Sequence, residues 1–148
     1  MKSIRDAGTL ATLKTRLESV TPDRQRVWGT MSPHQMLVHL AVAAEAATGV
    51  RPFAAPMRAP SRLLKWFALR APLRWPRGVK AGADPASAVL AADAFAADRT
   101  RAVDGLVALA SQGTTFAPAH PVFGPMARDD WHRWAYLHTD HHLRQFGL

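Results

Sequence analysis

Apolar residues recur at three- and four-residue spacings along four stretches of this chain, which is the periodicity of amphipathic helices. The first stretch runs from about Gly8 to Val20. The second begins at Ser32, where the serine, a following proline and Gln35 form the sequence of a capping box. It continues to Gly49, a residue type common just beyond a helix end. The pattern therefore predicts two helices in the first third of the chain.

Two further helices are predicted in the second half. The third stretch begins at Asp84-Pro85 and continues to Gly113, which makes it the longest predicted helix. The fourth follows a proline-rich loop at residues 120–125, and acidic residues 129 and 130 suit the positive end of its dipole. Ala127 stands where a serine or threonine cap would be expected. Alternating runs of β-branched residues are missing, so we predict no strands.

Between the second and third helices lies a long connection. Prolines at 52, 56, 60, 72 and 76 forbid a long helix there, although Arg62 to Arg70 can form a short one. We interpret residues 51–83 as a crossover that lets the two flanking helices run parallel. The fold class predicted is all-α, a four-helix bundle with this long crossover, built as a single domain over residues 1–148.

The net charge of +8 is concentrated in the crossover. Residues 51–83 contain eight Lys or Arg and no Asp or Glu, whereas the remaining chain holds eleven basic and eleven acidic residues. The basic residues are Arg51, Arg58, Arg62, Lys65, Arg70, Arg74, Arg77 and Lys80. Because the excess is local, it argues against nucleic acid as the partner. We expect the crossover to cover one end of the bundle and to supply cations that select an anionic substrate.

Trp66 and Trp75 lie inside this basic crossover. We expect them to pack the crossover onto the bundle, with a homodimer surface or a membrane interface as the alternatives. The prolines at 72 and 76 leave too little helix for a strong membrane anchor.

The chain has no cysteine, which excludes disulfides and thiolate metal ligands and leaves histidine and carboxylate as the strong metal-binding side chains. It shows neither an N-terminal secretory signal nor a run of about 18 apolar residues. We therefore expect a cytoplasmic protein without a transmembrane segment.

The most informative residues lie near the end of the sequence. His138 and His142 are one helical turn apart, on the face of the fourth helix that also carries tryptophans. His39 lies on an apolar face of the second helix and can supply a third imidazole. Three neutral imidazoles with one open position form the ligand set of a catalytic divalent metal site.

The other histidines receive different expectations. We expect His34 to be exposed or to cap its helix, His132 to lie on the surface, and His141 to lie at the rim of the site or contact a ligand. For His120 we favour a role in a turn near the mouth of the bundle.

Several residues are candidates for the surroundings of the metal. Trp131 and Trp134 fill the core or form a wall of a substrate pocket, and Gln145 hydrogen-bonds a ligand imidazole or caps the last turn. Glu45 is expected at the rim of the bundle, and Asp140 in solvent.

Three segments together resemble the DinB/YfiT-like metalloenzyme superfamily, and most closely a subgroup of uncharacterised proteins within it. They are Trp28-Gly-Thr-Met-Ser-Pro-His-Gln-Met-Leu-Val-His39-Leu, His120-Pro-Val-Phe-Gly124, and Tyr136-Leu-His138-Thr-Asp-His-His142-Leu-Arg-Gln145-Phe. The resemblance covers nearly the whole chain. It implies a four-helix bundle and a divalent ion, zinc, nickel or similar, held by His39, His138 and His142.

The resemblance also implies an activity. Members of this type include thiol S-transferases, in which a low-molecular-weight thiol is activated as a thiolate for transfer to a small-molecule substrate. A metal-dependent hydrolase is the enzymatic alternative, with His141 or His120 as the only evident general base. The alternative outside enzymology is a non-catalytic metal-binding or interaction module whose basic segment contacts a polyanion.

Overall fold

The computed structural model describes residues 1–53, 62–71, 74–78 and 90–148. Within these residues the chain is mainly helical, with one small two-stranded sheet. The elements are α1 (Ala7–Glu18), α2 (Pro33–Ala47), α3 (Arg62–Arg70), the 3-10 turn η2 (Ala92–Ala94), α4 (Phe95–Ala110), β1 (Ala119–His120), β2 (Gly124–Pro125) and α5 (Arg128–Gln145).

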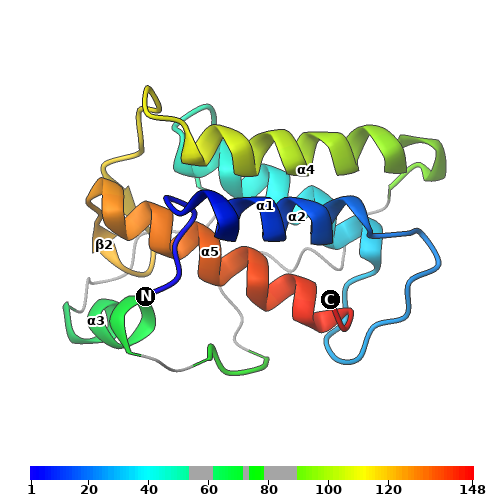
Figure 1. Cartoon of the computed structure of the whole chain (residues 1–148), viewed down its shortest axis with the longest axis horizontal. Coiled ribbons are helices and arrows are strands. Elements are labelled where there is room, and N and C mark those ends of the chain that lie inside the picture. The colour runs from blue at the N-terminus through cyan, green and yellow to red at the C-terminus, as the bar shows by residue number, and fades with distance from the viewer. Residues whose placement is uncertain (54–61, 72–73, 79–89) are drawn as a thin grey trace.

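Helices α1, α2, α4 and α5 lie side by side, and α3 lies outside this group, against the N-terminal half of α5 (Figure 1). Helices α2 and α4 run in the same direction, opposite to α1 and α5. The most extensive interface joins α2 and α4. It is close because Gly105 of α4 has no side chain, and a Cβ there would lie 2.9 Å from the Cβ of Ala44.

The core fills the space between these four helices, where every one of them contributes buried apolar residues. Examples are Leu13 and Leu17 of α1, Met36 and Leu37 of α2, Leu106 and Leu109 of α4, and Trp131 and Leu143 of α5. The spacings that predicted the helices are therefore the spacings of the core.

Local signals set most of the helix ends. Ser32 and Gln35 form the predicted capping box, with hydrogen bonds of 3.1 and 2.8 Å between each side chain and the other's backbone N–H. Gly49 follows α2 with a φ of 76°, a conformation that glycine adopts readily. At the start of α5 the Asp130 carboxylate accepts the Ala127 N–H at 3.1 Å, which partly compensates for the missing cap side chain.

Helix α4 begins later than predicted. Asp84 and Pro85 lie outside the described residues, Ala91 has an extended backbone, and the α-helix starts at Phe95. Residues 91–93 are exposed, so little packing holds them in a longer helix. As a result α5, with 18 residues, is longer than α4, with 16, and the expectation that the third helix is the longest was wrong.

The prediction of no strands was also wrong. Strands β1 and β2 pair antiparallel in the proline-rich loop, with His120 opposite Gly124. Each strand has two residues, which is too short to produce an alternating pattern.

The short helix in the crossover was predicted correctly as α3, and it packs on α5. Leu69 is fully buried, and its carbonyl accepts the Nε–H of Arg133 at 2.9 Å. Lys65 and Arg70 both form ion pairs with the buried carboxylate of Asp130, at 2.6 and 2.7 Å. Two predicted crossover cations, Arg58 and Lys80, lie outside the described residues. In the described part of the chain, no helix combines the length and apolar character needed to cross a bilayer.

Candidate metal centre

Three histidines from two helices converge at the middle of the fold. Nε2 of His138 lies 3.0 Å from Nε2 of His39 and 3.2 Å from Nε2 of His142. One ligand atom from each residue lies within 4.8 Å of the other two. The i, i+4 spacing on α5 aligns His138 and His142, and the packing of α2 against α5 brings in His39. These are the three residues that were predicted from the sequence as metal ligands.

The donor atoms fit a single bound ion. Imidazole nitrogens about 2.0–2.1 Å from a tetrahedral zinc ion lie roughly 3.3 Å from one another. The two short Nε2–Nε2 distances are within a few tenths of an ångström of this value. His39 and His138 retain some solvent exposure, whereas His142 is buried.

Gln145 fixes the orientation of one of the three rings. Its Oε1 lies 2.9 Å from Nδ1 of His142. Because an amide oxygen only accepts hydrogen bonds, Nδ1 carries the proton and Nε2 presents a lone pair to the cluster. One of the two contacts anticipated for Gln145 is therefore present.

Burial keeps these imidazoles neutral. It lowers the pKa of His39 to about 4 and holds the pKa values of His138 and His142 well below the usual 6.5. A neutral imidazole is the form that binds a metal ion.

A segment just before α2 supports Gln145 from behind. The backbone N–H groups of Val27 and Trp28 donate to the Gln145 carbonyl at 2.6 and 3.4 Å. Gly29 follows with a φ of 91°, and a Cβ there would lie 3.1 Å from Nε2 of Gln145. Sequence reasoning overlooked Gly29, because its role depends on a contact across 116 positions that no local pattern encodes.

The two candidate wall tryptophans differ in position. The Trp134 ring stacks on His138, with centroids 4.7 Å apart and planes 14° apart. Trp131 is fully buried, stacks between Phe53 and Phe116, and donates its Nε1–H to the Ala117 carbonyl at 3.0 Å. Trp131 is therefore a core residue, and only Trp134 flanks the histidines.

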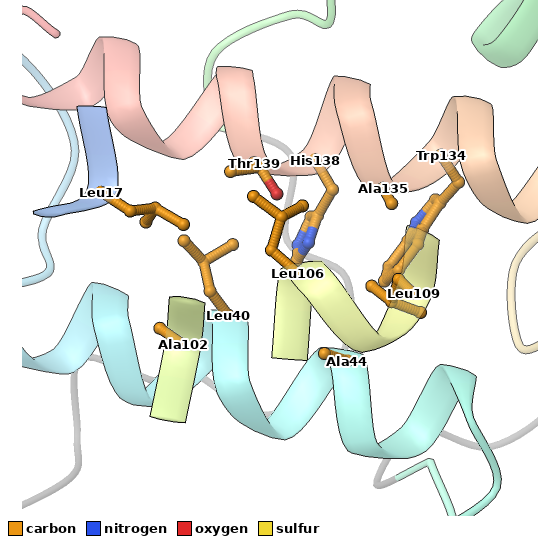
Figure 2. Close-up of a pocket in the computed structure, with 10 residues that line it drawn as sticks. All are labelled: Leu17, Leu40, Ala44, Ala102, Leu106, Leu109, Trp134, Ala135, His138 and Thr139. Carbon is orange, nitrogen blue, oxygen red and sulfur yellow. The ribbon is translucent and has the colours of Figure 1, made fainter. Parts of the chain in front are cut away.

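Little space remains on the inner side of His138. Figure 2 shows a cavity lined there by Trp134 and His138 from α5, Leu40 from α2 and Leu106 from α4. Its volume is about 10 Å³, room for one water molecule at most. A substrate therefore cannot reach the histidines through the core.

Aromatic and basic groups also lie near the histidine cluster. His141 contacts the edge of Trp28 at 5.0 Å between ring centroids, and Trp75 lies 6.1 Å from His141 and 6.3 Å from His138. The Arg77 guanidinium lies over the Trp28 ring at 5.2 Å. His141 thus lies beside the cluster as expected, and the crossover supplies one tryptophan and one cation to this rim, which consists of Trp28, Trp75, Arg77 and His141.

The remaining histidines behave less as expected. His34 is neither exposed nor a cap; its Nε2 lies 2.8 Å from the Asp98 carboxylate. His132 is buried rather than on the surface, because it packs edge-on against Phe116. His120 has the predicted turn role, since its Nδ1 accepts the Val122 N–H at 3.1 Å.

The two carboxylates near the ligand helices are both paired. Asp140 is not in solvent: it forms ion pairs with Arg16 of α1 and Arg144, each at 2.8 Å. Glu45 is partly exposed, as expected for the rim of the fold, and pairs with Arg51 and Arg101. The position of Asp140 on its own helix does not reveal that Arg16, on a neighbouring helix, pairs with it.

The chain belongs to a protein family of unknown function, DUF1569, whose model matches residues 6–147. No curated protein and no solved structure matches the chain. The family description assigns no activity.

Proposed function

We propose that His39, His138 and His142 hold one divalent metal ion, and that the chain is a metal-dependent enzyme on a four-helix bundle of the DinB type. The observation that supports this most strongly is the convergence of three Nε2 atoms at 3.0 and 3.2 Å. Nε2 of His138 takes part in both contacts. In a neutral imidazole this nitrogen has either one proton or one lone pair, so without an ion it cannot form a good hydrogen bond in both contacts. A bound ion accepts all three lone pairs.

The reaction proposed is transfer of a low-molecular-weight thiol to an electrophilic small molecule: the sulfur forms a bond to an electrophilic carbon, the bond from that carbon to its leaving group breaks with its electron pair, and the thiol proton goes to a base of the protein. A divalent ion held by the three histidines would lower the pKa of a bound thiol and favour its thiolate. The proposed acceptor of the thiol proton is His141, whose ring lies 5.3 Å from that of His142 and whose buried Nδ1 has no hydrogen-bond partner within the described residues. The indole of Trp134 holds the His138 ring in place by stacking.

The rim carries a cation that would favour a negatively charged substrate at the proposed site. Arg77 is held over Trp28, next to His141, so it can pair with a carboxylate or phosphate of the thiol or its acceptor. This supports the expectation that the basic crossover selects an anionic substrate.

Metal content tests the first part of the proposal. His39→Ala, His138→Ala and His142→Ala are each expected to reduce bound metal severely, as measured by elemental analysis of protein purified without a histidine tag. His34→Ala is the matched control, because it removes a histidine of α2 that pairs with Asp98 instead. Equal metal content in all four variants would refute the assignment.

Spectroscopy of the cobalt-substituted protein tests the reaction. Direct sulfur coordination changes the ligand field, so a small thiol should change the visible spectrum, and transfer to an electrophile should disappear in His142→Ala. With the metal bound, no spectral change across peptide-based and sugar-based thiols would instead favour hydrolysis, for which His141 serves equally as the base.

A further inference from the structure

Helix α3 presents its apolar side chains to solvent. Of the eight large apolar side chains that are exposed in the described part of the chain, four belong to this nine-residue helix. Their exposed fractions are 67% for Leu63, 48% for Leu64, 55% for Trp66 and 51% for Phe67. The expectation that Trp66 packs the crossover onto the fold was therefore wrong.

The helix is inverted relative to an ordinary amphipathic helix. At 100° per residue, positions 63, 64, 66 and 67 span an arc of about 160°, and positions 65 and 69 lie opposite. Leu69 is buried against α5, and Lys65 turns inward, where its Nζ donates to the Pro125 carbonyl and pairs with Asp130. A charged side chain thus faces the protein while an aromatic pair, Trp66 and Phe67, faces outward.

This orientation is held by specific bonds. The Asp130 carboxylate binds Lys65 and Arg70, the Leu69 carbonyl accepts from Arg133, and the Ala68 carbonyl accepts the Nε1–H of Trp75 at 2.8 Å. A rotation of α3 that buried its outer face would break these contacts. The exposed face is a fixed surface, and contiguous apolar surface of this kind marks an interaction site.

The charge around the face indicates the partner. Residues 46–83 contain no Asp or Glu, and α3 itself carries two exposed arginines, Arg62 and Arg70, while Arg74 and Arg77 follow it in the chain and are also exposed. The carboxylate that pairs with the helix within the described residues, that of Asp130, is buried and already neutralised. The partner must therefore offer both an apolar layer and negative charge.

We propose that the outer face of α3 binds the surface of an anionic lipid bilayer. A helix of nine residues, about 13 Å long, lies in the plane of the interface with its aromatic and leucine side chains among the upper acyl chains. The arginines lie at the level of the lipid phosphates. A second copy of the chain fits poorly, because pairing two such faces brings two sets of arginines together, and a nucleic acid leaves the apolar side chains exposed.

Binding to vesicles tests the proposal with the intact protein. It is expected to sediment with vesicles that contain phosphatidylserine, to bind phosphatidylcholine vesicles at least about tenfold more weakly, and to be released by high salt. Trp66→Ser combined with Phe67→Ser should reduce binding about tenfold or more. Val107→Ser is the matched control, since Val107 is 43% exposed on α4, away from this face.

A conservative variant reports on insertion itself. Trp66→Phe should bind normally but lose most of the fluorescence change that lipid produces, because the inserted indole is gone. Equal binding by the Trp66/Phe67 double variant and the parent, or no binding to anionic vesicles, would overturn the proposal. Lipid-independent dimerisation abolished by the double variant would assign the face to a second copy instead.

Discussion

Gln145 accepts a hydrogen bond from His142, the residue three positions earlier on the same helix, with Oε1 and Nδ1 2.9 Å apart. One turn of α5 therefore contains a proposed ligand and the group that sets its tautomer. In metal sites such supporting hydrogen bonds commonly change affinity by 10- to 100-fold.

The first prediction follows directly. Gln145→Ala should weaken metal binding by roughly 10- to 100-fold, because the His142 ring loses the bond that keeps its proton on Nδ1. Competition with a chelator of known affinity measures this. Gln145→Glu keeps an accepting oxygen and should retain metal; a similar loss in both variants would mean that the bond does not matter.

The second prediction separates backbone strain from a contact with the site. Gly29 and Gly49 both have positive φ, of 91° and 76°, so alanine at either position should cost about 1 kcal/mol of stability. Only at Gly29 does the new Cβ press on Gln145, and nothing lies within 4 Å of it at Gly49.

Both alanine variants should therefore unfold at lower temperature, whereas only Gly29→Ala should also bind metal more weakly. Differential scanning calorimetry and chelator competition measure the two effects. Unchanged metal affinity in Gly29→Ala would contradict the supporting role of this segment.

The third prediction concerns the attachment of α3. Asp130 is buried and neutralises both Lys65 and Arg70, so Asp130→Asn should reduce the free energy of unfolding by about 3 kcal/mol. Its neighbour Asp129 pairs with Arg5 in an exposed ion pair, with side chains 60% and 64% exposed. Asp129→Asn should change stability by less than about 1 kcal/mol. Urea denaturation distinguishes the two, and equal effects would rule out Asp130 as the anchor.

The fourth prediction concerns pH. In the metal-free protein, burial lowers the pKa of His39 and His120 to about 4, against 6.5 for an unperturbed histidine. Between these values the unfolded chain binds protons that the folded chain does not, so the free energy of unfolding should fall as pH drops from about 6.5 to 4.

Denaturant titrations of chelator-treated protein across this pH range measure the slope. His120→Asn removes one of the buried groups, so the unfolded chain should bind about one proton fewer in excess of the folded chain, and the slope of the unfolding free energy against pH should be shallower. The amide oxygen of the asparagine replaces the Nδ1 that accepts the Val122 N–H. A slope equal to that of the parent would show that His120 does not titrate in this way.

Local patterns were sufficient for the features that depend on neighbouring residues. The capping box at Ser32, the short helix at residues 62–70 and the alignment of His138 with His142 all follow from spacings of three to four residues. The approach of His39 could be anticipated because it lies on an apolar face of its own helix, which must pack against another.

Features that depend on distant contacts could not be predicted. His34 is held by Asp98, 64 positions away, and Asp140 by Arg16, 124 positions away. The sequence gives the face on which a residue lies, but not the partner that covers it. The prediction for Trp66 was wrong for the opposite reason, because an apolar residue was expected to be buried within the chain and Trp66 is exposed.

The positions of the histidines in the chain affect how an ion acts on the folding of the protein. His39 and His138 are 99 positions apart, so an ion that joins them closes a very large loop. In the chain-entropy description, a covalent link across about 100 residues removes several kcal/mol of disorder from the unfolded state, and a metal bridge is the reversible counterpart. Of the three ligands, only His138 and His142 are close in the sequence, so the complete ligand set arises only after α2 and α5 have assembled.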